Sequence, residues 1–248
     1  MYFIKKNIAN AITLTNLLCG LIAILYAFGG HLSIASSFII FGACLDFLDG
    51  MTARILNTDS NIGKQLDSFA DLITFGVAPG ILIFQLIYYT ESESFFNPYY
   101  DWVDRSAYSK NYWPYTAFLI PIFSSIRLAK FNVERSRKDQ FIGLPTPANA
   151  LFFISIPLMI TFQKENLITE WISQTHILIT LCFIMSFLLV TKIRLFTLKF
   201  KTFNWNNNHL RYILIFSSII LLFILHFAAV PFIVSLYIIL SIINTIKK

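Results

Sequence analysis

Long runs of hydrophobic residues dominate the chain, and short polar segments separate them. A helix that spans a membrane needs about 20 mostly apolar residues. Eight stretches have this character, and they lie at residues 11–30, 32–53, 67–90, 113–131, 144–162, 172–191, 210–227 and 229–246. The last two are separated only by a short segment around Ala228, Ala229 and Pro231. That segment predicts either a tight helical hairpin or one broken helix, so the pattern predicts about eight transmembrane helices, with seven as the alternative.

The composition supports this interpretation and excludes other classes of protein. Hydrophobic residues make up 56% of the 248 residues, charged residues make up 13%, and the mean hydropathy is +0.67. A disordered chain would be richer in charge, a disulfide scaffold needs more than the three cysteines present, and a soluble globule could not bury 26 Phe. We therefore expect an all-α integral membrane protein.

Lys and Arg are distributed unevenly between the two sets of loops. If the N-terminus is cytoplasmic, sixteen of the nineteen Lys and Arg residues fall on cytoplasmic segments. Cytoplasmic loops of membrane proteins carry such an excess. The net charge of +6 is therefore assigned to these loops, and no nucleic-acid partner is expected. Both termini are predicted to be cytoplasmic.

Four aspartates lie in the second and third apolar stretches. Asp46 and Asp49 are three residues apart, and Asp67 and Asp71 are four residues apart, so each pair shares one face of its helix. Two antiparallel helices joined by the short connecting loop can aim all four carboxylates at one point. The sequence therefore predicts a carboxylate cluster near the cytoplasmic membrane interface.

Divalent cations are the simplest partners for such a cluster. An Asp at the middle of a transmembrane helix costs about 2.5–3.5 kcal/mol, and neighbouring carboxylates also repel one another. Carboxylates suit Mg²⁺, Mn²⁺ and Ca²⁺, and no His or Cys lies close by in the sequence to favour zinc. Two alternatives stay open: ion pairs with Arg54 or Lys64, and a cation pathway of the kind that transporters have.

A carboxylate-bound metal pair at a membrane interface favours phosphoryl or phosphatidyl transfer, because the metals can hold a diphosphate. Arg54 could neutralise charge on the phosphates. A carboxylate that is spared from tight coordination could act as a general base on an attacking hydroxyl. Asp71 is the deepest of the four and is our candidate for that base.

The spacing of these residues resembles the signature of the CDP-alcohol phosphatidyltransferase family. The matching pattern runs Asp46-x2-Asp49-Gly50-x2-Ala53-Arg54-x8-Gly63-x3-Asp67-x3-Asp71. The resemblance implies that the four aspartates bind two divalent ions, Mg²⁺ or Mn²⁺, with Ca²⁺ as a further possible occupant, and that Asp71 is the base. It also implies that Gly50, Ala53, Arg54 and Gly63 line the site for CDP and its diphosphate.

Three further segments resemble one branch of this family, the membrane-embedded phosphatidylserine synthases. They are residues 12–24, Arg127–Asn132 and Phe141–Asn149. The resemblance implies CDP-diacylglycerol as donor and L-serine as acceptor, within a membrane of lipids and in a homodimer. Glycerol 3-phosphate or inositol is the alternative acceptor, and a divalent-cation transporter is the alternative outside the enzyme class.

Polar residues outside the signature have less specific roles. Arg127 and Lys130 could bind the serine carboxylate, or anchor the helix end and meet lipid phosphates. Asn132 is either a substrate contact or a helix cap. Asn16 could contact the nucleotide or form a hydrogen bond between helices.

These expectations combine into one catalytic unit, a single transmembrane domain over residues 1–248. A six-helix core covers about residues 10–191, and additional C-terminal helices cover about 210–246. We expect the active site to face the cytoplasm from a bacterial inner membrane, because CDP and serine are soluble in the cytoplasm.

Overall fold

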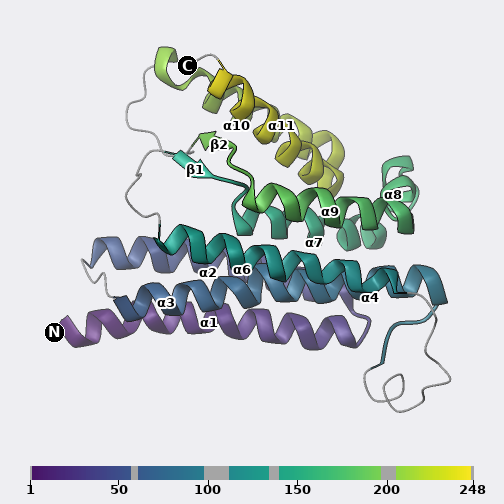
Figure 1. Cartoon of the computed structure of the whole chain (residues 1–248), viewed down its shortest axis with the longest axis horizontal. Helices are drawn as coiled ribbons and strands as arrows, with labels where there is room; N and C mark the ends of the chain where they lie inside the picture. Colours follow the sequence, from purple (N-terminus) through teal and green to yellow (C-terminus); the bar gives the residue numbers. More distant parts are fainter. Residues whose placement is uncertain (1, 57–60, 98–111, 134–139, 197–204, 247–248) are drawn as a thin grey trace.

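A computed structural model describes residues 2–56, 61–97, 112–133, 140–196 and 205–246. Within them the first six helical elements are α1 (Tyr2–Phe28), α2 (Leu32–Ile55), α3 (Asn61–Asp71), η1 (Leu72–Val77), α4 (Ala78–Ser92) and η3 (Trp113–Phe118). The other helices are α6 (Leu119–Val133), α7 (Thr146–Phe162), α8 (Leu167–Ile172), α9 (Thr175–Val190), α10 (Trp205–Leu225), η4 (His226–Ala228) and α11 (Ala229–Ile246). The prediction of an all-α protein is confirmed, and Figure 1 shows the helices packed into one elongated bundle.

Several helices have the length and composition of membrane spans. Four helical stretches qualify, and they are Ala9–Phe28, Leu32–Ala53, Asn61–Ser92 and Asn208–Thr245. The apolar helices α7 and α9 are shorter. Each of the predicted apolar stretches is helical over most of the length that the structure describes.

The bundle is organised around two buried helices. Most residues of α7 between Thr146 and Met159 are buried, and so are most residues of α4 between Ala78 and Ile87. A helix that is apolar all round belongs in an interior, and α7 packs against α2, α4, η1 and α11. Much of α1, α2 and the C-terminal pair is exposed, as expected for helices that face lipid.

The two C-terminal helices form a hairpin, which decides the question that the sequence left open. His226 has a left-handed backbone (φ 50°) at the turn, and α10 and α11 pack against each other. Gln163 at the end of α7 fixes the turn, because its side-chain amide donates to the Leu225 carbonyl (3.0 Å) and accepts from the Ala228 N–H (3.1 Å).

A small strand ladder was not expected from the sequence. β1 (Gln140–Ile142) pairs antiparallel with β2 (Arg194–Phe196). The ladder joins the segment before α7 to the segment after α9, and the Gly143 N–H extends it by donating to the Ile193 carbonyl (3.0 Å). Three-residue strands carry too little periodicity to be recognised from sequence alone.

A π-helical segment interrupts the third predicted helix. η1 begins directly after Asp71 and contains Thr74, which packs against α1 and α2. A Cβ placed on Gly20 would lie 2.6 Å from Thr74 Oγ1 and 2.9 Å from Thr74 Cα, and one on Gly42 would lie 2.7 Å from Thr74 Cγ2. The two glycines therefore allow the close approach of α1, α2 and η1 that brings the carboxylates together.

This close packing predicts that Gly20→Ala destabilises the protein by about 1–3 kcal/mol, because backbone atoms of Thr74 would have to move. The midpoint of thermal unfolding in detergent measures the effect. Gly29→Ala is the matched control, since its new Cβ would meet no atom closer than 3.4 Å. Equal midpoints for the two variants would contradict this account of the helix contact.

Candidate active site

The structure brings the predicted carboxylates together where α2 ends and α3 begins. Asp46, Asp49 and Asp67 each offer an oxygen, and these three oxygens all lie within 4.8 Å of one another. Asp46 and Asp49 are separated by one helical turn of α2, and Asp67 lies on the antiparallel α3. The convergence that the spacing predicted is therefore confirmed for three of the four residues.

Asp71 lies beside this group rather than within it. Its carboxyl group interacts directly with that of Asp46. Its Oδ1 atom is buried and has no hydrogen-bond partner among the described residues. Asp71 ends α3, and the π-helical segment η1 follows immediately. Single π turns are often found at functional sites, and this one sets the direction in which the helix continues past the deepest carboxylate.

Helix α1 provides a third wall of the site. The Thr13 hydroxyl donates to Asp49 Oδ2 at 2.6 Å, which fixes the orientation of that carboxylate. One turn further on, the Asn16 carbonyl accepts from Thr74 Oγ1 at 3.0 Å. The Asn16 side chain is fully buried, and neither of its amide atoms has a hydrogen-bond partner in the part of the chain that the structure describes.

The remaining residues of the signature lie next to the carboxylates. Gly50 and Ala53 follow Asp49 in α2, and Gly63 precedes Asp67 in α3, and all three are half-buried. Arg54 lies in the last turn of α2, but its side chain is outside the described part of the structure. Because Gly50 and Gly63 have no side chain and that of Ala53 is a single methyl group, a phosphate group could approach the backbone closely at these positions.

Arg127 is the buried cation of the site. Its side chain on α6 is 7% exposed, and its Nε has no hydrogen-bond partner among the described residues. The guanidinium lies 5.9 Å from the centre of the Phe131 ring and interacts electrostatically with Asp71 and Tyr237. A buried guanidinium with a free donor, close to a carboxylate, is suited to bind an anionic group of a ligand.

The two other predicted acceptor residues lie differently. Lys130 is exposed. The Asn132 amide donates to Ser68 Oγ at 2.8 Å, so it connects α6 to α3 next to Asp67. Asn132 therefore holds two helices of the site together. Of the three residues Arg127, Lys130 and Asn132, Arg127 alone is buried.

Sequence reasoning assigned no role to several residues that the structure places here. Thr13 bonds to Asp49. Tyr237 of α11 faces Arg127 and donates through its hydroxyl to the Phe196 carbonyl at 2.9 Å. In neighbouring helices, Ser124 of α6 and Thr146 and Asn149 of α7 also carry buried polar side-chain atoms without partners among the described residues. Thr13 could have been found from its spacing of three residues from Asn16, but no local signal points to Tyr237.

The chemistry of this donor set fits divalent metal ions. Three carboxylates within 4.8 Å repel one another unless a cation lies between them, and hard divalent ions prefer such oxygen ligands. The fold and the site together define a membrane-embedded protein with a cluster of carboxylates, suited to divalent ions, at one end of its bundle.

Comparison with known proteins identifies the family. Residues 6–181 match the family model described as CDP-alcohol phosphatidyltransferase, and the chain belongs to this family. It is 41% identical over 136 residues to the CDP-diacylglycerol–serine O-phosphatidyltransferase of Bacillus subtilis (strain 168). This match covers 55% of this chain and 67% of the relative.

Two further relatives carry the same name. The protein of Helicobacter pylori (strain ATCC 700392 / 26695) is 30% identical over 240 residues, covering 95% of this chain and 89% of the relative. That of Methanocaldococcus jannaschii is 29% identical over 168 residues, covering 67% and 69%. The match to the Helicobacter protein includes the C-terminal hairpin, which lies beyond the region that the family model covers.

The geometry predicts that Asp49→Ala weakens Mn²⁺ binding by at least about tenfold, because one of three converging ligands is lost. Mn²⁺ binding to the purified protein can be followed by electron paramagnetic resonance. Glu165→Gln serves as control, since this exposed residue lies in the α7–α8 connection. Unchanged Mn²⁺ affinity in Asp49→Ala would remove this residue from the metal site.

Proposed function

We propose that the protein transfers the phosphatidyl group of CDP-diacylglycerol to the hydroxyl of L-serine and releases CMP. The observation that carries this proposal is the cluster of three carboxylates with a fourth, Asp71, buried beside it. The family supplies the reaction class. Two relatives named CDP-diacylglycerol–serine O-phosphatidyltransferase, one matching 55% and the other 95% of this chain, favour serine among the possible acceptors.

We assign the metal site to Asp46, Asp49 and Asp67, with Asp71 as a further ligand. Mg²⁺ or Mn²⁺ are the proposed ions, two in number, and Ca²⁺ is a competing occupant. When bound, these ions would neutralise the carboxylates and the donor diphosphate and stabilise the charge on the departing CMP. The Thr13 hydrogen bond keeps Asp49 oriented toward them.

The proposed nucleotide site adjoins the metal ligands. Gly50, Ala53 and Gly63 would let the CDP diphosphate approach the helix backbones, and Arg54 would contribute positive charge. Asn16 would contact the nucleotide if its buried amide, which has no partner within the described residues, turned toward the site.

Asp71 is the proposed general base. Its carboxylate would accept the proton of the serine hydroxyl while that oxygen attacks the phosphorus that carries diacylglycerol. The bond from this phosphorus to the CMP oxygen breaks, and CMP leaves. The position of Asp71 beside the three-carboxylate group supports this role, because a base must keep an oxygen available to the acceptor.

Arg127 is the proposed partner of the serine carboxylate. It is buried, it has an unpaired Nε among the described residues, and it interacts with Asp71. An acceptor bound to Arg127 would therefore present its hydroxyl near the base. Asn132 would support this arrangement through Ser68, and the exposed Lys130 would meet lipid phosphates or the acceptor at the entrance.

The setting of the reaction follows from the membrane fold. We propose one catalytic unit over residues 1–248, in a bacterial inner membrane, with the active site and both termini cytoplasmic and with two copies forming a homodimer. The excess of Lys and Arg on the predicted cytoplasmic segments of the sequence supports this orientation. Figure 1 places the start of α1, the end of α2 and the start of α3 at the same end of the bundle.

The experiment that tests the function is CMP release from CDP-diacylglycerol by purified protein with Mn²⁺ or Mg²⁺. L-serine, glycerol 3-phosphate, inositol and no acceptor are compared in parallel. We expect release that requires serine and forms phosphatidylserine. Release with a different alcohol would contradict the acceptor, and no release with any acceptor from folded protein would contradict phosphatidyl transfer.

Asp71→Asn is expected to lower kcat by a factor of about 10² to 10⁴, the usual contribution of a general base. Binding of CDP-diacylglycerol should change much less, because three other carboxylates remain. Stopped assays of CMP release give kcat, and titration with CDP-diacylglycerol gives the donor affinity. A loss of donor affinity as large as the loss of kcat would assign Asp71 to binding instead.

Arg127→Ala is expected to raise the KM for serine by a factor of about 10 to 100, since a charge-assisted hydrogen bond contributes about 1.5–3 kcal/mol. The KM for CDP-diacylglycerol should stay within a factor of about three. Lys164→Ala, an exposed residue between α7 and α8, controls for the loss of a positive charge. If the serine KM does not change, Arg127 is not part of the acceptor site.

A further inference from the structure

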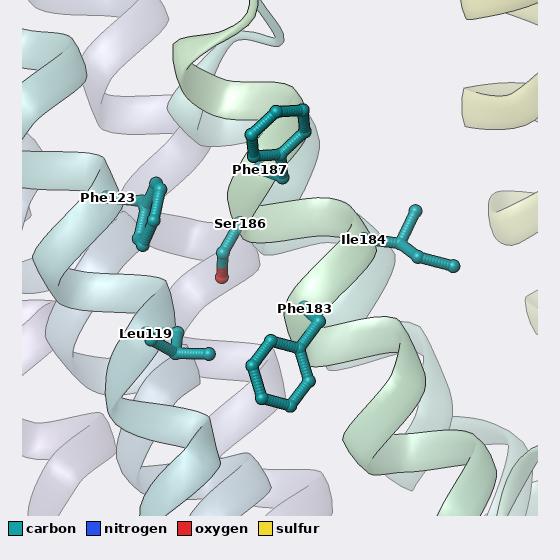
Figure 2. A pocket seen from close by; sticks show the side chains of 6 residues that line it. All are labelled: Leu119, Phe123, Phe183, Ile184, Ser186 and Phe187. Atoms are coloured by element: carbon teal, nitrogen blue, oxygen red, sulfur yellow. The ribbon is translucent and has the colours of Figure 1, made fainter.

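An apolar pocket lies between α6 and α9. Its volume is about 410 Å³, and it is lined by Leu119, Phe123, Phe183, Ile184, Ser186 and Phe187. Figure 2 shows Leu119 and Phe123 on one helix facing Phe183 and Phe187 on the other, whereas Ile184 points away. This volume falls in the range of ligand sites. The pocket can therefore hold a large apolar group.

One polar atom interrupts the apolar lining. Ser186 is 1% exposed, and its Oγ has no hydrogen-bond partner in the described part of the chain. In Figure 2 its hydroxyl points from α9 toward α6. By contrast, the Thr180 hydroxyl of α9 donates to the His176 carbonyl at 2.7 Å, and the Ser125 hydroxyl of α6 donates to the Ile122 carbonyl at 2.7 Å. A buried donor without a partner is costly, so a ligand that brings an acceptor into this pocket would be favoured.

The pocket is open toward the surface that faces lipid. Phe183 and Phe187 are 53% and 64% exposed although they are large apolar side chains in a helix composed like a membrane segment. A hydrocarbon chain could enter sideways from the bilayer without crossing water.

The pocket also lies next to the candidate active site. Phe123 precedes Arg127 by one turn of α6, which is about 6 Å along the helix axis. Arg127 interacts with Asp71, and a Cβ on Gly76 of η1 would lie 3.1 Å from Ser124 Cβ. The Asn132 end of α6 is bonded to α3 near the carboxylates, so Leu119 lies deeper in the bundle than Arg127. The pocket therefore extends from the site away from the cytoplasmic end.

We propose that this pocket binds one acyl chain of the phosphatidyl donor, with the Ser186 hydroxyl donating a hydrogen bond to the ester carbonyl of that chain. An acyl ester supplies the two things that the pocket requires, an apolar chain and one acceptor at its head. The inference rests on the proposed function only for the identity of the donor as CDP-diacylglycerol.

Donor binding in detergent, with Mn²⁺ and without any acceptor, tests the proposal directly. The dissociation constants of dioleoyl and dihexanoyl CDP-diacylglycerol are compared for the wild type and for Leu119→Trp, which fills the pocket. We expect long-chain binding to weaken by at least about tenfold, since several buried methylenes are lost, and short-chain binding to change by less than about threefold. For each donor, the dissociation constant of the variant is divided by that of the wild type. This ratio removes the effect of the donor's own partitioning into detergent micelles.

Ser186→Ala tests the polar contact separately. It should weaken both donors about fivefold, because both carry the ester carbonyl and one hydrogen bond is lost. Ser125→Ala is the matched control, since that hydroxyl on α6 already donates to the Ile122 carbonyl at 2.7 Å. Phe216→Trp on α10, 68% exposed, controls for an added Trp at the lipid surface.

Several outcomes would overturn the proposal. Equal effects of Leu119→Trp on long and short chains, or no effect on either, would show that no acyl chain occupies the pocket. A change in oligomeric state with unchanged donor binding would assign the pocket to a second copy of the chain. Wild-type protein that binds neither donor would refute the proposed function itself. Because the binding assay contains no acceptor, an error in the choice of serine would not affect its result.

Discussion

The mutual repulsion of four clustered carboxylates is the constraint on which the rest of this structure depends. Asp46, Asp49 and Asp67 converge within 4.8 Å, and Asp71 interacts with Asp46 at the side of the group. A bundle stabilised by apolar packing alone would separate such charges. Their convergence is understandable if bound cations form part of the working protein, because the cations convert repulsion among ligands into attraction toward a shared centre.

The helices around the cluster are arranged to keep it in place. Gly20 and Gly42 let α1 and α2 approach η1 closely, and Thr13 fixes Asp49 by a short hydrogen bond. On the other side, Arg127 places a buried positive charge next to Asp71. Tyr237 extends this arrangement to the C-terminal hairpin, since its hydroxyl bonds to the Phe196 carbonyl and its ring packs edge-on against Phe196. The hairpin thus contacts the site although it lies beyond residues 6–181, which the family model covers.

Much of this arrangement could be predicted from the sequence because it rests on regular helical periodicity. The spacings of Asp46 with Asp49 and of Asp67 with Asp71 place each pair on one helix face, and hydrophobic length gives the helices. The π turn after Asp71 could not be predicted, because it arises from the packing of Thr74 against two glycines in other helices. The β1–β2 ladder and the contact between Tyr237 and Arg127 likewise depend on tertiary packing between segments far apart in the chain.

Diffraction from crystals grown with Mn²⁺ and CDP-diacylglycerol would test the central claim most directly, because anomalous scattering locates the manganese. We predict manganese bound by Asp46, Asp49 and Asp67, in contact with the donor diphosphate, and Asp71 turned toward the space beside Arg127. Manganese bound elsewhere, or a diphosphate held away from these carboxylates, would contradict the account.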